Sequence, residues 1–149
     1  RPAHIEQVGL TASLQALIRE VSQSSEIRFE RRVENVDDVF NQDAATNIYR
    51  IAQEALNNLI KHSRAKQAII TVERDLHSVR IRIADDGVGF QLSLAMAQRG
   101  LGLTSITERV RMLGGRLDIQ SAPRKGTQVA IEVPVAERIP TAPVNSAKT

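Results

Sequence analysis

Apolar residues recur along the chain at two different spacings, and each spacing predicts one kind of secondary structure. Where every third or fourth residue is apolar, an amphipathic helix is expected. This pattern marks a first helix that begins near Thr11, and two further helices over residues 43–63 and 103–113. Where apolar and polar residues alternate, a half-buried strand is expected. That pattern marks residues 27–33, 68–72, 79–83, 117–119 and 129–133.

Polar turns separate these stretches and fix their order. Residues 75–78 and 123–126 predict two hairpins, and Gly114 with Gly115 ends the third helix. We expect Asp43 to cap the second helix, and residues 90–99 to form a loop because they lack a periodic pattern. The order is helix, strand, helix, hairpin, loop, helix, hairpin. It predicts an α+β fold, a two-layer α/β sandwich with about three helices on one face of a mixed, mostly antiparallel sheet.

Composition narrows the class of protein. A chain of 149 residues, of which 42% are hydrophobic, can form one ordinary domain with its own core. The absence of Cys excludes disulfides and thiolate metal sites. Aromatic residues make up 3% of the chain and Trp is absent, so no nucleic acid partner is expected, whereas a net charge of +3 suits a small polyanion. No apolar run approaches the roughly 20 residues that span a bilayer, so this piece itself is not expected to insert into a membrane.

The two ends of the sequence lack the features of a complete chain or of a folded element. Residues 1–4 contain neither Met nor a signal-peptide pattern, so we interpret the chain as a piece of a longer cytoplasmic protein and leave open whether another segment anchors that protein in a membrane. Residues 137–149 have little apolar content and are expected to form a disordered tail.

One face of the second helix carries candidate chemistry. Glu54, Asn58 and Lys61 follow one another at spacings of four and three, which places them together, and His62 lies between this face and the apolar stripe. An Asn oxygen is a suitable ligand for Mg²⁺, Lys61 can neutralise phosphate charge, and Glu54 can polarise an attacking group. For the helix alone, a solvated surface is the favoured interpretation.

Three glycine-containing turns complete the pattern. Asp85 follows a strand and offers an acceptor to an amino group, while Gly87 and Gly89 remove side chains that would block a flat ligand. Residues 100–103, Gly-Leu-Gly-Leu, precede a helix whose N–H groups can hold phosphate, with Arg99 beside them. Residues 126–127, Gly-Thr, close the last hairpin. Each turn alone is ordinary, but together with the helix they indicate a nucleotide site.

These residues carry a family resemblance. Residues 53–62, Gln-Glu-Ala-Leu-Asn-Asn-Leu-Ile-Lys-His, resemble the N box of sensor histidine kinases. Residues 85–90 resemble the G1 box, residues 100–103 the G2 box and residues 126–127 the final Gly-Thr element of the wider ATPase superfamily that includes gyrase, Hsp90 and MutL. The Glu-Ala-Leu-x-Asn form, and residues 107–115, are similar to the nitrate-sensor and DegS-like subfamily. The resemblance implies the Bergerat-type ATP-binding fold.

The resemblance also implies roles for individual residues. Glu54 and Lys61 would be catalytic, and Asn58 would ligate Mg²⁺. Asp85 would accept a hydrogen bond from the adenine amino group, and Thr127 would lie beneath the adenine. The residues implied to contact or shape bound ATP are Asn58, His62, Asp85, Gly87, Gly89, Arg99, Gly100, Leu101, Gly102, Leu103 and Thr127.

Members of the family transfer the γ-phosphoryl group to a His on a dimeric helical hairpin, and then to an Asp on a response regulator. His4, His62 and His77 do not stand in the sequence expected of that acceptor. The resemblance therefore implies that residues 1–9 end such a hairpin, that residues 10–136 form the catalytic domain, and that the acceptor lies upstream. The implied partners are the hairpin of the same protein, as a homodimer, and a receiver domain, and the parent would sit at the bacterial inner membrane if it is anchored.

Other functions stay open at this point. An ATP hydrolase of the gyrase or MutL kind would use Glu54 to activate water. An anti-sigma-like kinase would phosphorylate Ser on a partner, and a regulatory module would bind nucleotide without turnover. A plain α/β scaffold would require the ordered boxes to be a coincidence.

Overall fold

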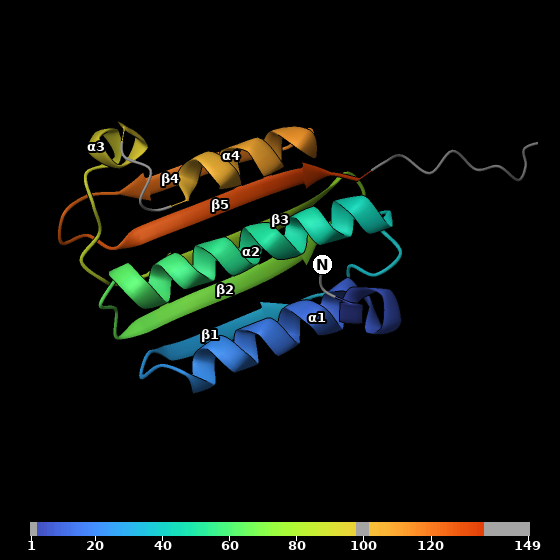
Figure 1. The fold of residues 1–149 in the computed structure, drawn as a ribbon, viewed down its shortest axis with the longest axis horizontal. Helices are drawn as coiled ribbons and strands as arrows, with labels where there is room; N and C mark the ends of the chain where they lie inside the picture. Colours follow the sequence, from blue (N-terminus) through green and yellow to red (C-terminus); the bar gives the residue numbers. More distant parts are fainter. Residues whose placement is uncertain (1–2, 98–101, 136–149) are drawn as a thin grey trace, which may run out of the picture.

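The computed structural model describes residues 3–97 and 102–135. Its core is a five-stranded sheet in the order β1-β2-β3-β5-β4 (Figure 1). The strands are β1 (Arg28–Val33), β2 (Gln67–Arg74), β3 (Ser78–Asp85), β4 (Arg116–Ser121) and β5 (Thr127–Pro134). The helices of the described residues are α1 (Ala3–Gln23), α2 (Gln42–His62), α3 (Leu92–Ala97) and α4 (Leu103–Met112).

The sheet is mixed, as the sequence predicts. β1 pairs with β2 in parallel, because α2 carries the chain from the end of one strand back to the start of the other. β2 and β3, β3 and β5, and β4 and β5 pair in antiparallel fashion. The consecutive pairs β2–β3 and β4–β5 are hairpins that need only short turns, whereas a parallel pair needs a long crossover. The predicted α+β fold class is thus confirmed.

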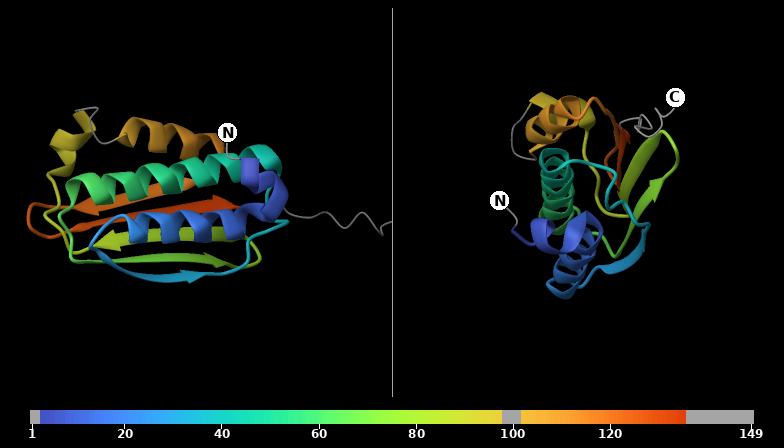
Figure 2. Two further views of the ribbon diagram at one scale, coloured as in Figure 1. Left: turned by 60° about the horizontal axis from the view of Figure 1, so that its bottom comes forward. Right: turned by 90° about the vertical axis from the view of Figure 1, so that its right-hand side faces the viewer.

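Three helices cover one face of the sheet. α2 lies between α1 and α4, and the two-layer arrangement is clear from the side (Figure 2). Beneath the helices, alternate residues of the three central strands are buried, as strand geometry requires. They are Ala68, Ile70, Val72, Val79, Ile81, Ile83, Val129, Ile131 and Val133.

The start of α2 differs from the prediction. Asn41, and not Asp43, is the N-cap: its backbone is extended, with φ −72° and ψ 175°, and its side chain accepts a hydrogen bond from the N–H of Ala44 at 2.8 Å. Asp43 instead lies in the first turn of the helix, where a carboxylate interacts favourably with the helix dipole.

The first helix begins earlier than expected. Helical backbone starts at Ala3 and is interrupted at Gly9, whose φ of 92° lies in the left-handed region. Beyond this break, the N–H of Thr11 donates to a carboxylate oxygen of Asp37 at 2.9 Å, and the N–H of Val36 donates to the Thr11 hydroxyl at 2.8 Å. The predicted start near Thr11 therefore marks the second of two helical pieces, and the first piece also contributes to the core through Ile5.

A short helix occupies the predicted loop. α3 has six residues, too few to show a 3.6-residue repeat, which explains why the sequence pattern missed it. Leu92 packs against the core, whereas Leu94 is 57% exposed. The predicted tail over residues 137–149 lies outside the described residues, and none of the described helices is long and apolar enough to cross a bilayer.

Candidate functional site

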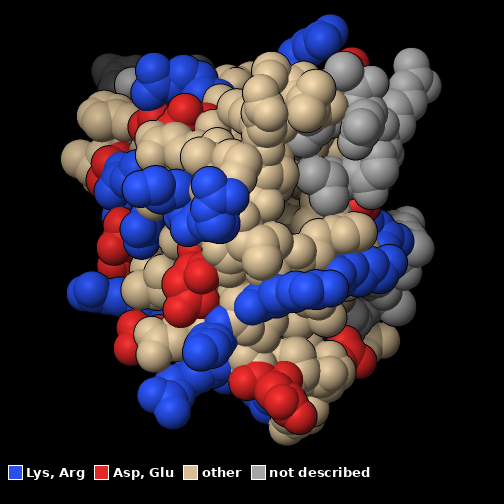
Figure 3. Space-filling model, turned by 90° about the vertical axis from the view of Figure 1, so that its left-hand side faces the viewer, with Lys and Arg blue, Asp and Glu red and all other residues tan. Residues whose placement is uncertain are grey.

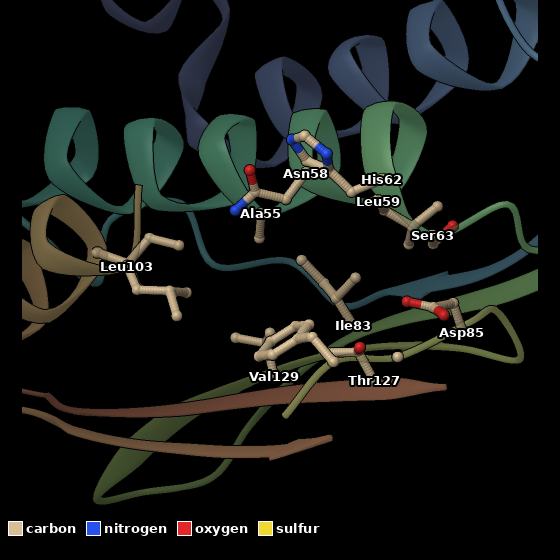
Figure 4. Close-up of a pocket in the computed structure, with 13 residues that line it drawn as sticks. Ala55, Asn58, Leu59, His62, Ser63, Ile83, Asp85, Leu103, Thr127 and Val129 are labelled. Atoms are coloured by element: carbon tan, nitrogen blue, oxygen red, sulfur yellow. The ribbon is translucent and has the colours of Figure 1, made fainter. Parts of the chain in front are cut away.

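A pocket opens between α2 and the sheet, at the end of the molecule where α2 and β3 finish and where β5 and α4 begin (Figure 4). It encloses about 650 Å³, its open mouth included. Its lining is mostly apolar, with a few polar groups, which is typical of small-molecule sites. The lining residues are Ala55, Asn58, Leu59, His62, Ser63, Ile83, Asp85, Gly89, Phe90, Leu103, Ile106, Thr127 and Val129.

One face of α2 forms the roof of this pocket. Ala55, Asn58, Leu59 and His62 follow at the spacing of a single helix face and all line the pocket. Ala55 and Leu59 are buried, whereas Asn58 is half-buried and His62 is exposed. Asn58 and His62 therefore place polar groups at the edge of an apolar surface.

Asp85 and Thr127 stand opposite each other on the floor. They are paired residues at the ends of β3 and β5, and both line the pocket. A carboxylate oxygen of Asp85 accepts a hydrogen bond from the N–H of Gly87 at 2.8 Å. Burial raises the pKa of the Asp85 carboxyl above its ordinary value, while backbone hydrogen bonds from Gly87 and Thr127 act in the opposite direction. The result is a half-buried hydrogen-bond acceptor beside an apolar surface.

The loop after β3 is threaded between two other segments. A Cβ atom at Gly87 would collide with the carbonyl oxygen of Ser63, and one at Gly89, where φ is +65°, would collide with that of Ala122. Between them, Val88 donates its N–H to the Ser63 carbonyl at 2.7 Å. This tight passage requires glycine, because any side chain would displace the wall of the pocket.

The start of α4 borders the pocket through Leu103, which is buried. Gly102 precedes it as a left-handed N-cap with φ 65°, and a Cβ atom at Gly102 would collide with the carboxylate of Glu54. Glu54 therefore lies against Gly102 and is not among the lining residues. Lys61, in the last turn of α2, is exposed and also outside the lining.

The sequence matches a known protein family. Residues 43–137 match the model of the histidine kinase-, DNA gyrase B-, and HSP90-like ATPases. The chain belongs to this family. Family membership makes it part of an ATPase class, so the pocket between α2 and the sheet is the candidate nucleotide site.

Individual relatives are sensor histidine kinases. LiaS of Bacillus subtilis is 30% identical over 135 residues, which cover 91% of this chain and 37% of LiaS. ComP of the same organism is 32% identical over 89% of this chain and 17% of ComP. MctS of Rhizobium johnstonii is 33% identical over 94% of this chain and 31% of MctS. The chain thus spans less than half the length of each of these curated relatives.

Solved histidine kinase structures share the fold. The histidine kinase domain of the blue-light activated kinase of Erythrobacter litoralis superimposes with a TM-score of 0.71, at 20% identity, over 86% of this chain and 62% of that one. The catalytic domain of the histidine kinase ThkA superimposes with a TM-score of 0.67, at 20% identity, over 85% and 90%. At such low identity the likeness concerns the fold alone.

The structure of this ATPase-family chain brings together six of the residues named from the sequence. Asn58, His62, Asp85, Gly89, Leu103 and Thr127 line the pocket. Gly87 supports the loop beside it, as its contact with Ser63 shows, and Glu54, Lys61 and Gly102 lie outside the lining. Arg99, Gly100 and Leu101 fall outside the described residues. Their proposed roles stay predictions.

Sequence reasoning missed three further contributors. Ser63 and Phe90 line the pocket. Ser63 directly follows the N box and Phe90 is the last residue of the G1 box, so their positions were the only signal for them. Ser121 contacts the floor from behind: its hydroxyl oxygen accepts from the N–H of Phe90 at 2.9 Å and lies 2.8 Å from the hydroxyl of Thr127. Nothing in the sequence near Ser121 indicated this contact.

Basic side chains surround the pocket end of this ATPase-family domain. Lys and Arg residues spread across this end of the molecule, with acidic groups among them (Figure 3). The exposed ones near the loop after β3 are Lys61, Arg64, Lys66, Arg124 and Lys125. No cluster of three or more His, Cys, Asp or Glu side chains that could hold a metal occurs among the described residues.

Proposed function

We propose that this chain is the ATP-binding catalytic domain of a two-component sensor histidine kinase, and that it binds Mg·ATP in the pocket beneath α2. The observation that carries the proposal is the pairing of Asp85 and Thr127 on a floor that faces Asn58 on α2, with an apolar surface between. A flat base fits the apolar part, and a charged tail fits the polar edge.

The base would lie at the Asp85 end. Burial and the bordering apolar residues Ile83 and Val129 make this an unfavourable place for an unpaired carboxylate, so an amino group that donates to Asp85 gains a well-placed acceptor. The cradle formed at Gly87 and Gly89 supports this assignment, because side chains there would push the loop out of place.

The phosphates would lie toward Asn58 and the start of α4. The amide oxygen of Asn58 is a hard, neutral ligand of the kind that Mg²⁺ accepts beside water and phosphate oxygens. The first turn of α4 contains no acidic residue, so its N–H groups suit phosphate. Arg99, Gly100 and Leu101 belong to the proposed phosphate end, and Lys61 and His62 are proposed to contact phosphate or ribose. Bound Mg²⁺ would neutralise phosphate charge.

The residues of this chain would act mainly by position and charge, as phosphoryl transfer demands. Glu54 is proposed to orient and polarise the acceptor, which requires that its carboxylate leave its present place against Gly102. The acceptor is proposed to be a His on a helical hairpin that precedes residue 10, in a homodimeric parent protein that passes the group on to a receiver domain.

Calorimetric titration with Mg·ADP tests nucleotide binding. We expect the unmodified chain to bind and Asp85→Asn to bind at least tenfold more weakly, because the amide presents one acceptor oxygen and no charge. Asp75→Asn is the matched control: Asp75 is an exposed carboxylate in the β2–β3 turn, away from the pocket, and should leave the dissociation constant unchanged. Absence of binding by the unmodified chain would refute the nucleotide site.

Addition of a purified helical hairpin that contains the acceptor His tests the reaction. Phosphate on the hairpin that is labile in acid and stable in base supports the histidine kinase. Acid-stable phosphate on a partner would favour a Ser kinase, and steady ATP turnover without any acceptor would favour a hydrolase of the gyrase or MutL kind.

A further inference from the structure

The hydroxyl of Ser121 joins two walls of the pocket without lining it. Its oxygen accepts a hydrogen bond from the N–H of Phe90 at 2.9 Å, lies 3.1 Å from the carbonyl oxygen of Gly126 and lies 2.8 Å from the hydroxyl of Thr127. Phe90 and Thr127 line the pocket, whereas Ser121 faces a separate hollow behind the β4–β5 turn. Ser121 therefore acts on the pocket through its neighbours.

The three contacts of Ser121 restrict the protons around it. A Ser hydroxyl has one proton to donate and two lone pairs to accept with. All three contacts form at once only if Ser121 donates to the Gly126 carbonyl and accepts from both the Phe90 N–H and the Thr127 hydroxyl. In that arrangement the Thr127 proton points toward Ser121, and the Thr127 oxygen keeps its lone pairs for a ligand.

We propose that Ser121 is a positioning residue of the nucleotide pocket. Its hydroxyl holds the backbone at Phe90 and the side chain of Thr127 in fixed relation, and it leaves the lone pairs of the Thr127 hydroxyl oxygen for the base. The inference rests on the proposed function. It predicts that Ser121 matters to the base end alone, because it contacts Thr127 there, while Asn58 and Leu103 lie away from Thr127 in the pocket (Figure 4).

The test compares Ser121→Ala with Ser78→Ala. Ser78 is buried near the opposite end of β3, and its hydroxyl donates to a carboxylate oxygen of Glu132 at 3.1 Å, so its loss perturbs the same sheet away from the pocket. Dissociation constants for ADP and for a non-hydrolysable ATP analogue are measured by calorimetry, with the melting temperature of each variant. Ser121→Ala should raise the dissociation constants of both nucleotides by the same factor. We expect about three- to tenfold for the loss of one or two hydrogen bonds. Ser78→Ala should lower the melting temperature and leave both dissociation constants within about twofold of those of the unmodified chain.

A double-mutant cycle separates positioning from general destabilisation. Thr127→Val removes the shared hydrogen bond from the other side, so Ser121→Ala should have a smaller effect in the Thr127→Val background than in the unmodified chain. Ser121→Thr, which keeps the hydroxyl, should restore most of the affinity. If Ser121→Ala lowers the melting temperature without changing either dissociation constant, or if the two substitutions are additive, the inference is wrong. An unmodified chain that binds no nucleotide would remove the proposed function together with it.

Discussion

Asp85 lies directly opposite Thr127 in the ladder between β3 and β5, and the same two residues close the floor of the pocket. The carboxyl of Asp85 is half-buried there, and burial raises its pKa above the ordinary value. The pairing therefore holds a ligand-binding group in a position that is unfavourable for its own ionised form.

Replacement of the Asp85 carboxyl should raise the stability of the fold and should weaken nucleotide binding. Because the pKa of Asp85 is raised in the folded chain, folding disfavours the ionised form, and this cost appears as the pH rises above the ordinary pKa of about 4. Asp85→Asn should therefore have the higher melting temperature at pH 7, and its advantage should shrink toward pH 4. Thermal unfolding at both pH values measures this. A variant less stable than the unmodified chain at pH 7 would contradict it.

The contribution of Asp86 to stability should depend on pH in the opposite direction. Its carboxylate accepts hydrogen bonds from the N–H groups of Lys66 and Gln67, at 2.9 and 3.0 Å, and these lower its pKa. A lowered pKa contributes stability that is present above the ordinary value and is lost as the pH falls through the folded value. We expect Asp86→Ala to melt at a lower temperature than the unmodified chain at pH 7. The difference between the two melting temperatures should become smaller in acid. A difference that grows in acid would refute the assignment.

Two glycines with nearly equal φ angles should respond differently to alanine. Gly89 and Gly114 have φ of 65° and 68°, but a Cβ atom at Gly89 would collide with the Ala122 carbonyl, whereas the nearest atom to one at Gly114 is Pro134 Cγ at 3.9 Å. Gly114→Ala should cost about 1–2 kcal/mol, the strain of a left-handed alanine. Gly89→Ala should cost more, on the order of 3 kcal/mol. Urea unfolding of both variants measures the two costs, and equal costs would mean that the carbonyl moves away freely.

The cap of α2 provides a test of the corrected helix start. Asn41→Ala removes the side chain that accepts from Ala44 and should lower the free energy of unfolding by about 1 kcal/mol. Asp43→Ala removes only a favourable charge in the first turn and should cost about half as much or less. The reverse order in urea unfolding would restore Asp43 as the cap.

The fold could be read from the sequence where the pattern was long enough. All five strands were predicted because each alternates over several residues, and hairpin turns or helices separate them. α3 was missed because six residues do not complete two helical turns. Asn41 and Asp43 are both good caps only two positions apart, and the sequence does not reveal which one adopts the extended backbone.

The sequence predicted the motif residues of the site better than the residues that hold them in place. Asn58, Asp85 and Thr127 were named because their residue types suit a nucleotide, and the structure gathers them in one pocket. Ser121 was not named, because its contact with the N–H of Phe90 forms only when the backbone at Phe90 passes close to the β4–β5 turn. The place of the Glu54 carboxylate likewise depends on how closely α4 approaches α2, which no local pattern encodes.

The start of α1 and the end of β5 both lie at the end of the molecule opposite the pocket, with α2 running between the two ends (Figure 1). A helix of 21 residues is about 30 Å long at 1.5 Å per residue. If the proposed transfer takes place, an acceptor attached before residue 3 starts roughly one helix length from the nucleotide. The histidine of a preceding hairpin would then have to cover that distance, either along its own helix or from a second copy of the protein.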